Sequence, residues 1–201
     1  MRYSPHAAAF SAPYLARRAL LLLLCVFATV GPPAAGAAES RLALRDVAIA
    51  VDESVYELDA RLDLDLPGAA RKAVESGLTL RLTYEIVIDR TRRYMLDAEV
   101  ASLAQRYEVN YHALSQRWLL RNLNTGEQSD FGSLDMALAR ISELRGLPIL
   151  DTALLPPGPT YEGRIRAVLD LSTAPDAFGW LLFWADDWSA TSDWQTWKLG
   201  P

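Results

Sequence analysis

Residues 78–90 read LTLRLTYEIVIDR, and this stretch decides how the chain is built. Its even positions are all apolar from Leu78 to Ile88, and its odd positions are polar except for Val87. Successive side chains of a strand point to opposite faces of a sheet, so the pattern predicts a long, half-buried strand. Such a strand needs antiparallel neighbours and a cover for its apolar face.

The first 37 residues have the features of a cleaved secretory signal. Three arginines precede an apolar run over residues 19–30, and Ala35-Gly36-Ala37 offers a cleavage site. The run is shorter than the roughly 20 apolar residues that a bilayer span needs. We therefore expect an exported, periplasmic protein with one domain over residues 38–201 and no stable membrane span after cleavage.

The composition of residues 38–201 excludes several classes of function. This part has 17 basic and 25 acidic residues, a net charge of −8, which argues against nucleic-acid binding. The lone cysteine, Cys25, precedes the cleavage site, and His112 is the one histidine after it. Disulfides, thiol catalysis and Cys/His zinc sites are therefore not expected. No metal or other cofactor is implied by any motif.

Further strands are predicted on both sides of the central one. Residues 42–51 alternate with a change of phase at Arg45-Asp46, which indicates a β-bulge. Residues 56–66 and 161–171 alternate cleanly, and a short helix over residues 69–76 is closed by Gly77.

The middle of the chain is harder to assign. Residues 95–106 fit either a helix or a strand whose phase changes once, and we favour two long strands between residues 94 and 123. A longer helix is expected from Ser133, as its N-cap, through Leu144, with Gly146 and Pro148 ending it. The predicted fold class is α+β: a long, twisted, mainly antiparallel sheet of about six strands, covered on one face by one longer and one short helix.

The C-terminal segment is rich in tryptophan and carries the candidate binding residues. A continuous apolar run over residues 178–184 is followed by further tryptophans. Tryptophan is enriched both in cores and at interfaces, so the segment is either buried as a last strand or forms an aromatic contact surface. The candidate binding residues are Trp184, Trp188, Ser192 and Trp194.

Three segments resemble a bacterial family known as domain of unknown function 4390. They are residues 77–90, residues 107–114, and residues 161–170 together with the tail from Asp187 to Trp194. The resemblance covers roughly residues 42–197. It implies an exported protein of unassigned activity whose gene often lies beside that of a nitrogen-regulation-type sensor kinase, and it assigns no catalytic residue.

Three classes of function are compatible with these observations. The first is a non-enzymatic interaction or regulatory module with a membrane or envelope protein as partner, for example a sensor kinase. The second is a protein that binds a small apolar ligand or lipid in a pocket between sheet and helix. The third is an enzyme, for which we find no catalytic motif. Carboxylates at Asp186-Asp187 or on the face of Asp59, Asp63 and Asp65, together with His112, would be its candidates.

Overall fold

The computed structural model describes residues 41–172 and 188–199, and the predicted signal segment lies outside this part. The elements in chain order are β1 (Arg41–Asp52), β2 (Val55–Asp65), α2 (Gly68–Glu75), β3 (Thr79–Thr91), β4 (Ala98–His112), β5 (Arg117–Asn122), β6 (Gln128–Phe131), α3 (Leu134–Ile141), β7 (Glu143–Asp151), the 3-10 turn η1 (Thr152–Leu154), β8 (Thr160–Ser172), β9 (Ser189–Thr191) and β10 (Gln195–Leu199).

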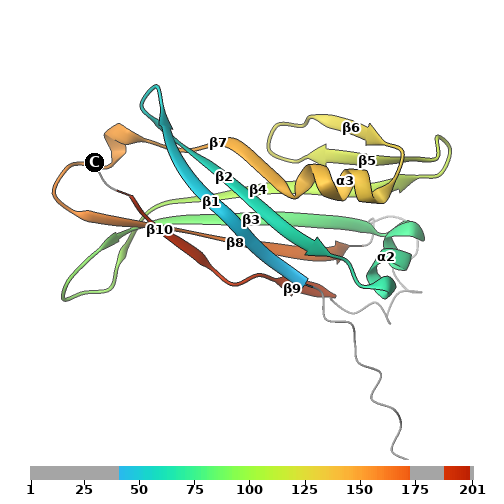
Figure 1. Cartoon of the computed structure of the whole chain (residues 1–201), viewed down its shortest axis with the longest axis horizontal. Coiled ribbons are helices and arrows are strands. Elements are labelled where there is room, and N and C mark those ends of the chain that lie inside the picture. The colour runs from blue at the N-terminus through green and yellow to red at the C-terminus, as the bar shows by residue number, and fades with distance from the viewer. Residues whose placement is uncertain (1–40, 173–187, 200–201) are drawn as a thin grey trace, which may run out of the picture. The chain divides into compact units, whose positions relative to one another are not determined.

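The strands form two antiparallel sheets. The larger sheet has seven strands in the order β10-β8-β3-β4-β5-β6, with β9 also paired to β8, and the smaller one has the order β1-β2-β7. Figure 1 shows β1 and β2 crossing the larger sheet, with α2 and α3 beside them. The predicted α+β class and the long antiparallel sheet are confirmed. The smaller sheet was not predicted. Together with the helices, it covers the apolar face of the larger sheet.

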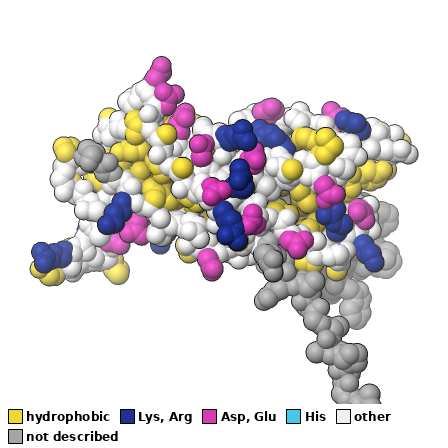
Figure 2. Space-filling view, viewed as in Figure 1, with side chains coloured by type: hydrophobic (Ala, Val, Ile, Leu, Met, Phe, Trp, Pro, Cys, Tyr) yellow, Lys and Arg dark blue, Asp and Glu magenta, His cyan; other side chains and the backbone are white. Residues whose placement is uncertain are grey.

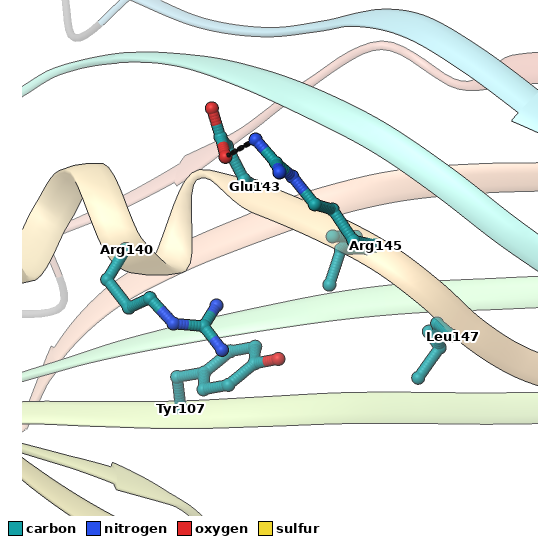
Figure 3. Close-up of a pocket in the computed structure, with 6 residues that line it drawn as sticks. Tyr107, Arg140, Glu143, Arg145 and Leu147 are labelled. Atoms are coloured by element: carbon teal, nitrogen blue, oxygen red, sulfur yellow. Dashed lines mark hydrogen bonds and ion pairs between the residues drawn. The ribbon is translucent and has the colours of Figure 1, made fainter.

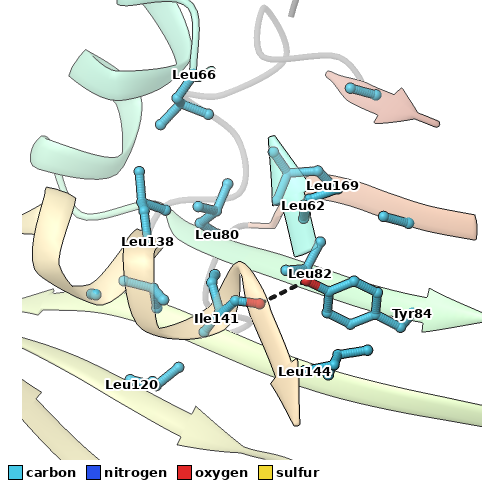
Figure 4. Packing of buried hydrophobic residues seen from close by; sticks show 14 of the residues in the cluster. Leu62, Leu66, Leu80, Leu82, Tyr84, Leu120, Leu138, Ile141, Leu144 and Leu169 are labelled. Carbon is cyan, nitrogen blue, oxygen red and sulfur yellow. Dashed lines mark hydrogen bonds between the residues drawn. The ribbon is translucent and has the colours of Figure 1, made fainter. Parts of the chain in front are cut away.

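The central strand behaves as its alternation predicts. The even-numbered side chains of β3 from Leu80 to Ile88 are at most 1% exposed, and the odd-numbered ones are half-buried. The inward side chains from Leu80 to Ile86 pack in the main core cluster with side chains of β2, α3 and β8 (Figure 4). Ile88 belongs to a second, smaller core cluster with Tyr56, Leu150, Leu155, Tyr161 and Leu199. The core lies between the two layers, and burial of its large side chains supplies the main driving force for folding.

Two predicted irregularities are present in the strands. The pairing of β1 with β2 shifts register between Arg45 and Ala48, and Asp46 has a positive φ of 52°. The pairing of β3 with β4 shifts between Ile88 and Asp89. The extra residue in β4 explains the change of phase that made residues 95–106 ambiguous, and the structure resolves them as a loop followed by strand from Ala98.

The predicted longer helix is wrong at its C-terminal end. Ser133 caps α3 as expected, with its Oγ accepting from the Met136 amide at 3.2 Å, but the helix ends at Ile141. The Ser142 hydroxyl donates to the Leu138 carbonyl at 2.8 Å, and the chain then enters β7. The pairing of β7 with β2 begins at Glu143, so α3 ends before the predicted terminators are reached. Helices α2 and α3 both have eight residues, and neither is the longer one.

Strand β7 contains the two residues that were expected to terminate the helix. Gly146 adopts a φ of 56° and donates its amide to Asp59 Oδ1 at 2.7 Å. Pro148 is tolerated because β7 is an edge strand, where a missing amide donor leaves no ladder partner unsatisfied.

Candidate interaction site

The C-terminal tail returns along the edge of β8. Strand β9 pairs with residues 168–170 of β8 and strand β10 with residues 161–165. Of the four candidate binding residues, Trp184 lies outside the described residues. The other three, Trp188, Ser192 and Trp194, occupy different environments, and only one of them lies over charged side chains on the outer face of the sheet.

Ser192 is buried and continues the pairing between β9 and β10. Its amide donates to the Ala167 carbonyl at 2.9 Å, and its Oγ accepts from the Ala167 amide at 2.9 Å. The same hydroxyl donates to the Asp193 carbonyl at 3.0 Å. Ser192 therefore supplies hydrogen-bond partners to the Ala167 backbone of β8 between the segments paired with β9 and β10, and its role is structural.

Trp188 and Trp197 pack inward. Trp188 is half-buried against the main core, and Trp197 lies against both core clusters. Trp197 stands opposite Gly163 of β8, where an added Cβ would come within 2.2 Å of its ring. This strand position thus needs glycine because the indole occupies the space of a side chain. The tail is in part a last strand of the core, as one of the two sequence interpretations proposed.

Trp194 instead lies on the outer face of the large sheet. The guanidinium carbons of Arg164 and Arg166 are 5.1 and 4.6 Å from the centroid of its ring. Arg166 pairs with Glu85 at 2.6 Å, and Arg164 pairs with Asp89 at 3.3 Å. Each cation–π contact is worth about 0.5–1 kcal/mol at such exposed positions. The four charged groups hold the half-buried indole in one orientation.

The outer face continues toward β4 with a further charged group. Arg81 pairs with Glu108 at 2.7 Å, and its pKa is raised mainly by that hydrogen bond. Partial burial raises the pKa of the nearby Asp170, with Arg81 acting in the opposite direction and Glu108 adding to the rise. This part of the face carries paired charges, and they contribute little to the free energy of unfolding because such pairs are partly solvated.

A cavity lies between the layers beside the free edge of β7. Its volume is about 330 Å³, and Figure 3 shows Arg140 of α3 with its guanidinium directed toward Tyr107 of β4. Burial raises the pKa of Tyr107, and Arg140 counteracts part of the rise. Glu143 and Arg145 form an ion pair at 2.6 Å at the rim. The lining also includes Leu144 and Leu147, so three of its six residues are charged.

The other chemical candidates are engaged in local contacts. His112 is exposed at the end of β4, and its Nδ1 lies 2.8 Å from the hydroxyl of Ser115. Asp59 accepts from the Gly146 amide, and Asp63 pairs with Arg45. Within the described residues, no group of three potential ligands stands close enough to hold a metal ion. The pair Asp186-Asp187 lies outside the described residues.

In class, the described chain is an antiparallel α+β protein with an aromatic–arginine cluster on its outer face. A family model for the Domain of unknown function (DUF4390) matches residues 39–198, and the chain belongs to this family. The resemblance inferred from the sequence is thereby confirmed. No curated protein and no solved structure matches the chain. In the part of the chain that the structure describes, neither α2 nor α3 is long and apolar enough to cross a bilayer.

Sequence reasoning found Trp194 but missed its two arginine neighbours as part of one site. The alternation in residues 161–171 places Arg164 and Arg166 on the outward face, which is correct. It contains no signal that the tail returns along this particular strand. A pairing between segments about 30 residues apart depends on the whole sheet, and it is not readable from a local pattern.

Proposed function

We propose that this protein is an exported interaction module of the bacterial envelope that recognises a membrane protein, with a sensor kinase as the first candidate. The carrying observation is the cluster of Trp194 with Arg164 and Arg166 on the outer face of β8. Tryptophan and arginine are the residue types that most often dominate binding energy at protein interfaces. The apolar N-terminal run and the site after it support export.

The cluster is arranged for binding before any partner arrives. Glu85 and Asp89 fix the two guanidinium groups, and these in turn fix the indole. An interface with side chains already ordered loses less conformational entropy on association. The remaining donors of the arginines suit carboxylate groups, so an acidic, partly aromatic surface is the expected complement.

The direct test is an in-cell photocrosslink from the cluster. A photoreactive residue replaces the exposed Thr196, and the captured species is identified by mass spectrometry with and without Trp194→Ala. We expect one membrane protein to be captured and its yield to fall at least tenfold in the variant. A photoreactive residue at the exposed Leu114 in the β4–β5 turn serves as the positional control. Equal capture from both positions, or undiminished capture by folded Trp194→Ala protein, would contradict the proposal.

The cavity beside β7 supports a second candidate, a small-ligand site between sheet and helix. Its volume of about 330 Å³ is within the range of ligand pockets. The charged half of the lining favours an amphipathic ligand with an anionic group near Arg140 over a wholly apolar one. Native mass spectrometry of gently purified protein should then show an adduct that Arg140→Gln weakens. A clean apo mass, with no thermal shift across a panel of fatty acids, would remove this candidate.

A further inference from the structure

The loop between β3 and β4 exposes large apolar side chains. Tyr94, Met95 and Leu96 are 87%, 69% and 92% exposed, and they are consecutive in sequence. Single exposed apolar residues are ordinary on protein surfaces, but three in succession at a turn need an explanation. Packing in the core does not explain why these three residues are apolar, because none of them belongs to either core cluster.

The same turn is basic on its N-terminal side. Arg92 and Arg93 directly precede the apolar residues, and no acidic residue occurs between residues 90 and 96. The Arg93 guanidinium stands 5.7 Å from the centroid of the Tyr94 ring. Asp97 is the first acidic residue, and its Oδ1 accepts from the Arg92 amide at 3.0 Å, which shapes the turn. The basic and apolar groups therefore share one short turn.

The turn is also placed where it can reach a surface. In Figure 1 the hairpin of β3 and β4 projects beyond the ends of the neighbouring strands. In Figure 2 the end of this projection carries Lys/Arg and apolar side chains together. The pairing of β3 with β8 ends at Thr91 and Thr160, and none of the strands that the structure describes pairs with residues 92–97.

We propose that residues 92–96, here called the hairpin tip, dock the protein on an anionic lipid bilayer. Arginines at the level of the headgroups and an aromatic and aliphatic group at the boundary of the acyl chains are the combination that binds such surfaces. Residues 38–201 carry a net charge of −8 even with the two arginines of the tip included, so the same bilayer repels the rest of the protein. Contact is thereby confined to the tip, which orients the molecule.

This inference does not depend on the Trp194 cluster, since the two sites use different residues. Docking at the tip would hold an envelope protein beside the membrane without any spanning helix. A single tip with two arginines and three apolar groups gives weak and reversible attachment, because stable anchoring generally needs a second signal.

The experiment uses the exported form expected after signal cleavage, residues 38–201, which contains every described core residue and no cysteine. Met95→Cys carries one environment-sensitive dye, and vesicles contain either phosphatidylcholine alone or phosphatidylcholine with phosphatidylglycerol. We expect a blue-shifted, stronger emission with the anionic vesicles only, which weakens as salt is raised. Leu114→Cys, at a site that is 94% exposed, is the matched control and should show no change.

Two variants separate the two parts of the tip, and circular dichroism verifies that each is folded. Binding should fall by more than about 25-fold in Arg92→Glu/Arg93→Glu, because each lost basic residue contributes about fivefold and the anionic surface also repels each new carboxylate. Tyr94→Ser/Leu96→Ser should lower binding to the same vesicles by about tenfold or more through lost apolar burial. Absence of vesicle binding, equal binding to neutral vesicles, or the same response from the Leu114 position would each overturn the proposal. So would undiminished binding by the charge-reversed variant.

Discussion

The two faces of β3 differ in what they contribute. Its inner face is sealed between the layers and includes Tyr84, whose hydroxyl donates to the Ile141 carbonyl at 2.7 Å. Its outer face is half-buried and carries charged groups such as Glu85 and Arg81 in ion pairs. One strand thus carries core side chains on its inner face and solvated ion pairs, beside the proposed interaction site, on its outer face. Substitutions inside should unfold the protein, whereas those outside should leave the fold intact and alter contacts.

The largest contrast is expected between two neighbouring residues of β3. Ile86→Ala removes a fully buried side chain and should lower the free energy of unfolding by about 2–5 kcal/mol. Val87→Ala, on the outer face, removes a half-buried one and should cost less than about 1.5 kcal/mol. Urea denaturation of both variants measures the difference. Similar losses from the two substitutions would break the distinction between the faces.

A slightly smaller effect is expected where the tail contacts the inner side of β8. Gly163→Ala places a Cβ within 2.2 Å of the Trp197 ring and should cost about 1–3 kcal/mol through overpacking. The double variant Gly163→Ala/Trp197→Ala should cost less than the sum of the two single changes, since the clash is absent from it. Additive losses in a double-mutant cycle would show that Trp197 is not the reason why position 163 requires glycine.

The buried hydroxyl of Tyr84 gives a third test of the inner face. Tyr84→Phe leaves the Ile141 carbonyl without this donor and should cost about 1–3 kcal/mol at pH 7. Burial raises the pKa of Tyr84 far above its ordinary value, so above about pH 10 only the unfolded chain ionises there. Stability should therefore fall more steeply above pH 10 in the wild type than in the variant. The free energy of unfolding is measured by denaturant titration at a series of pH values. The same dependence on pH in both proteins would argue against a buried hydroxyl that stays un-ionised in the folded state.

The smallest expected effect has the opposite sign and lies on the outer face. Partial burial raises the pKa of Asp170, so the folded state disfavours its charged form above about pH 4. Asp170→Asn should raise the melting temperature slightly at pH 7, and the gain should vanish below pH 4, where the wild type is protonated. A lower melting temperature in the variant would instead show that the Arg81–Asp170 attraction dominates.

Much of the fold was predictable because its long strands alternate cleanly. The inward set of β3 and the bulges in β1 and β4 were all visible as phase patterns. The split into two sheets was not visible, because alternation says which face is buried but not which strand lies beside it. The end of α3 was mispredicted because glycine and proline commonly terminate helices. Here Gly146 and Pro148 instead lie in the edge strand β7.

The site was predictable only in part. Trp194 stood out by residue type, whereas its dependence on Arg164 and Arg166 follows from the tail returning along β8. Ser192 was grouped with the tryptophans, but its hydroxyl completes the ladder of β8. The cavity at Tyr107 and Arg140 joins β4 to α3, and no sequence motif connects these elements.

The pairing of β3 on both sides has a consequence for how the chain folds after synthesis. On one side its neighbour is β4, which follows after a short turn, whereas on the other Glu85 meets Arg166, 81 residues later. Local pairing closes a small loop quickly, and the distant pairing must close a long one. The edge of β3 that pairs with β8 therefore stays unpaired until β8 arrives during folding. In that interval its free amide and carbonyl groups can pair with a strand from another copy of the same chain.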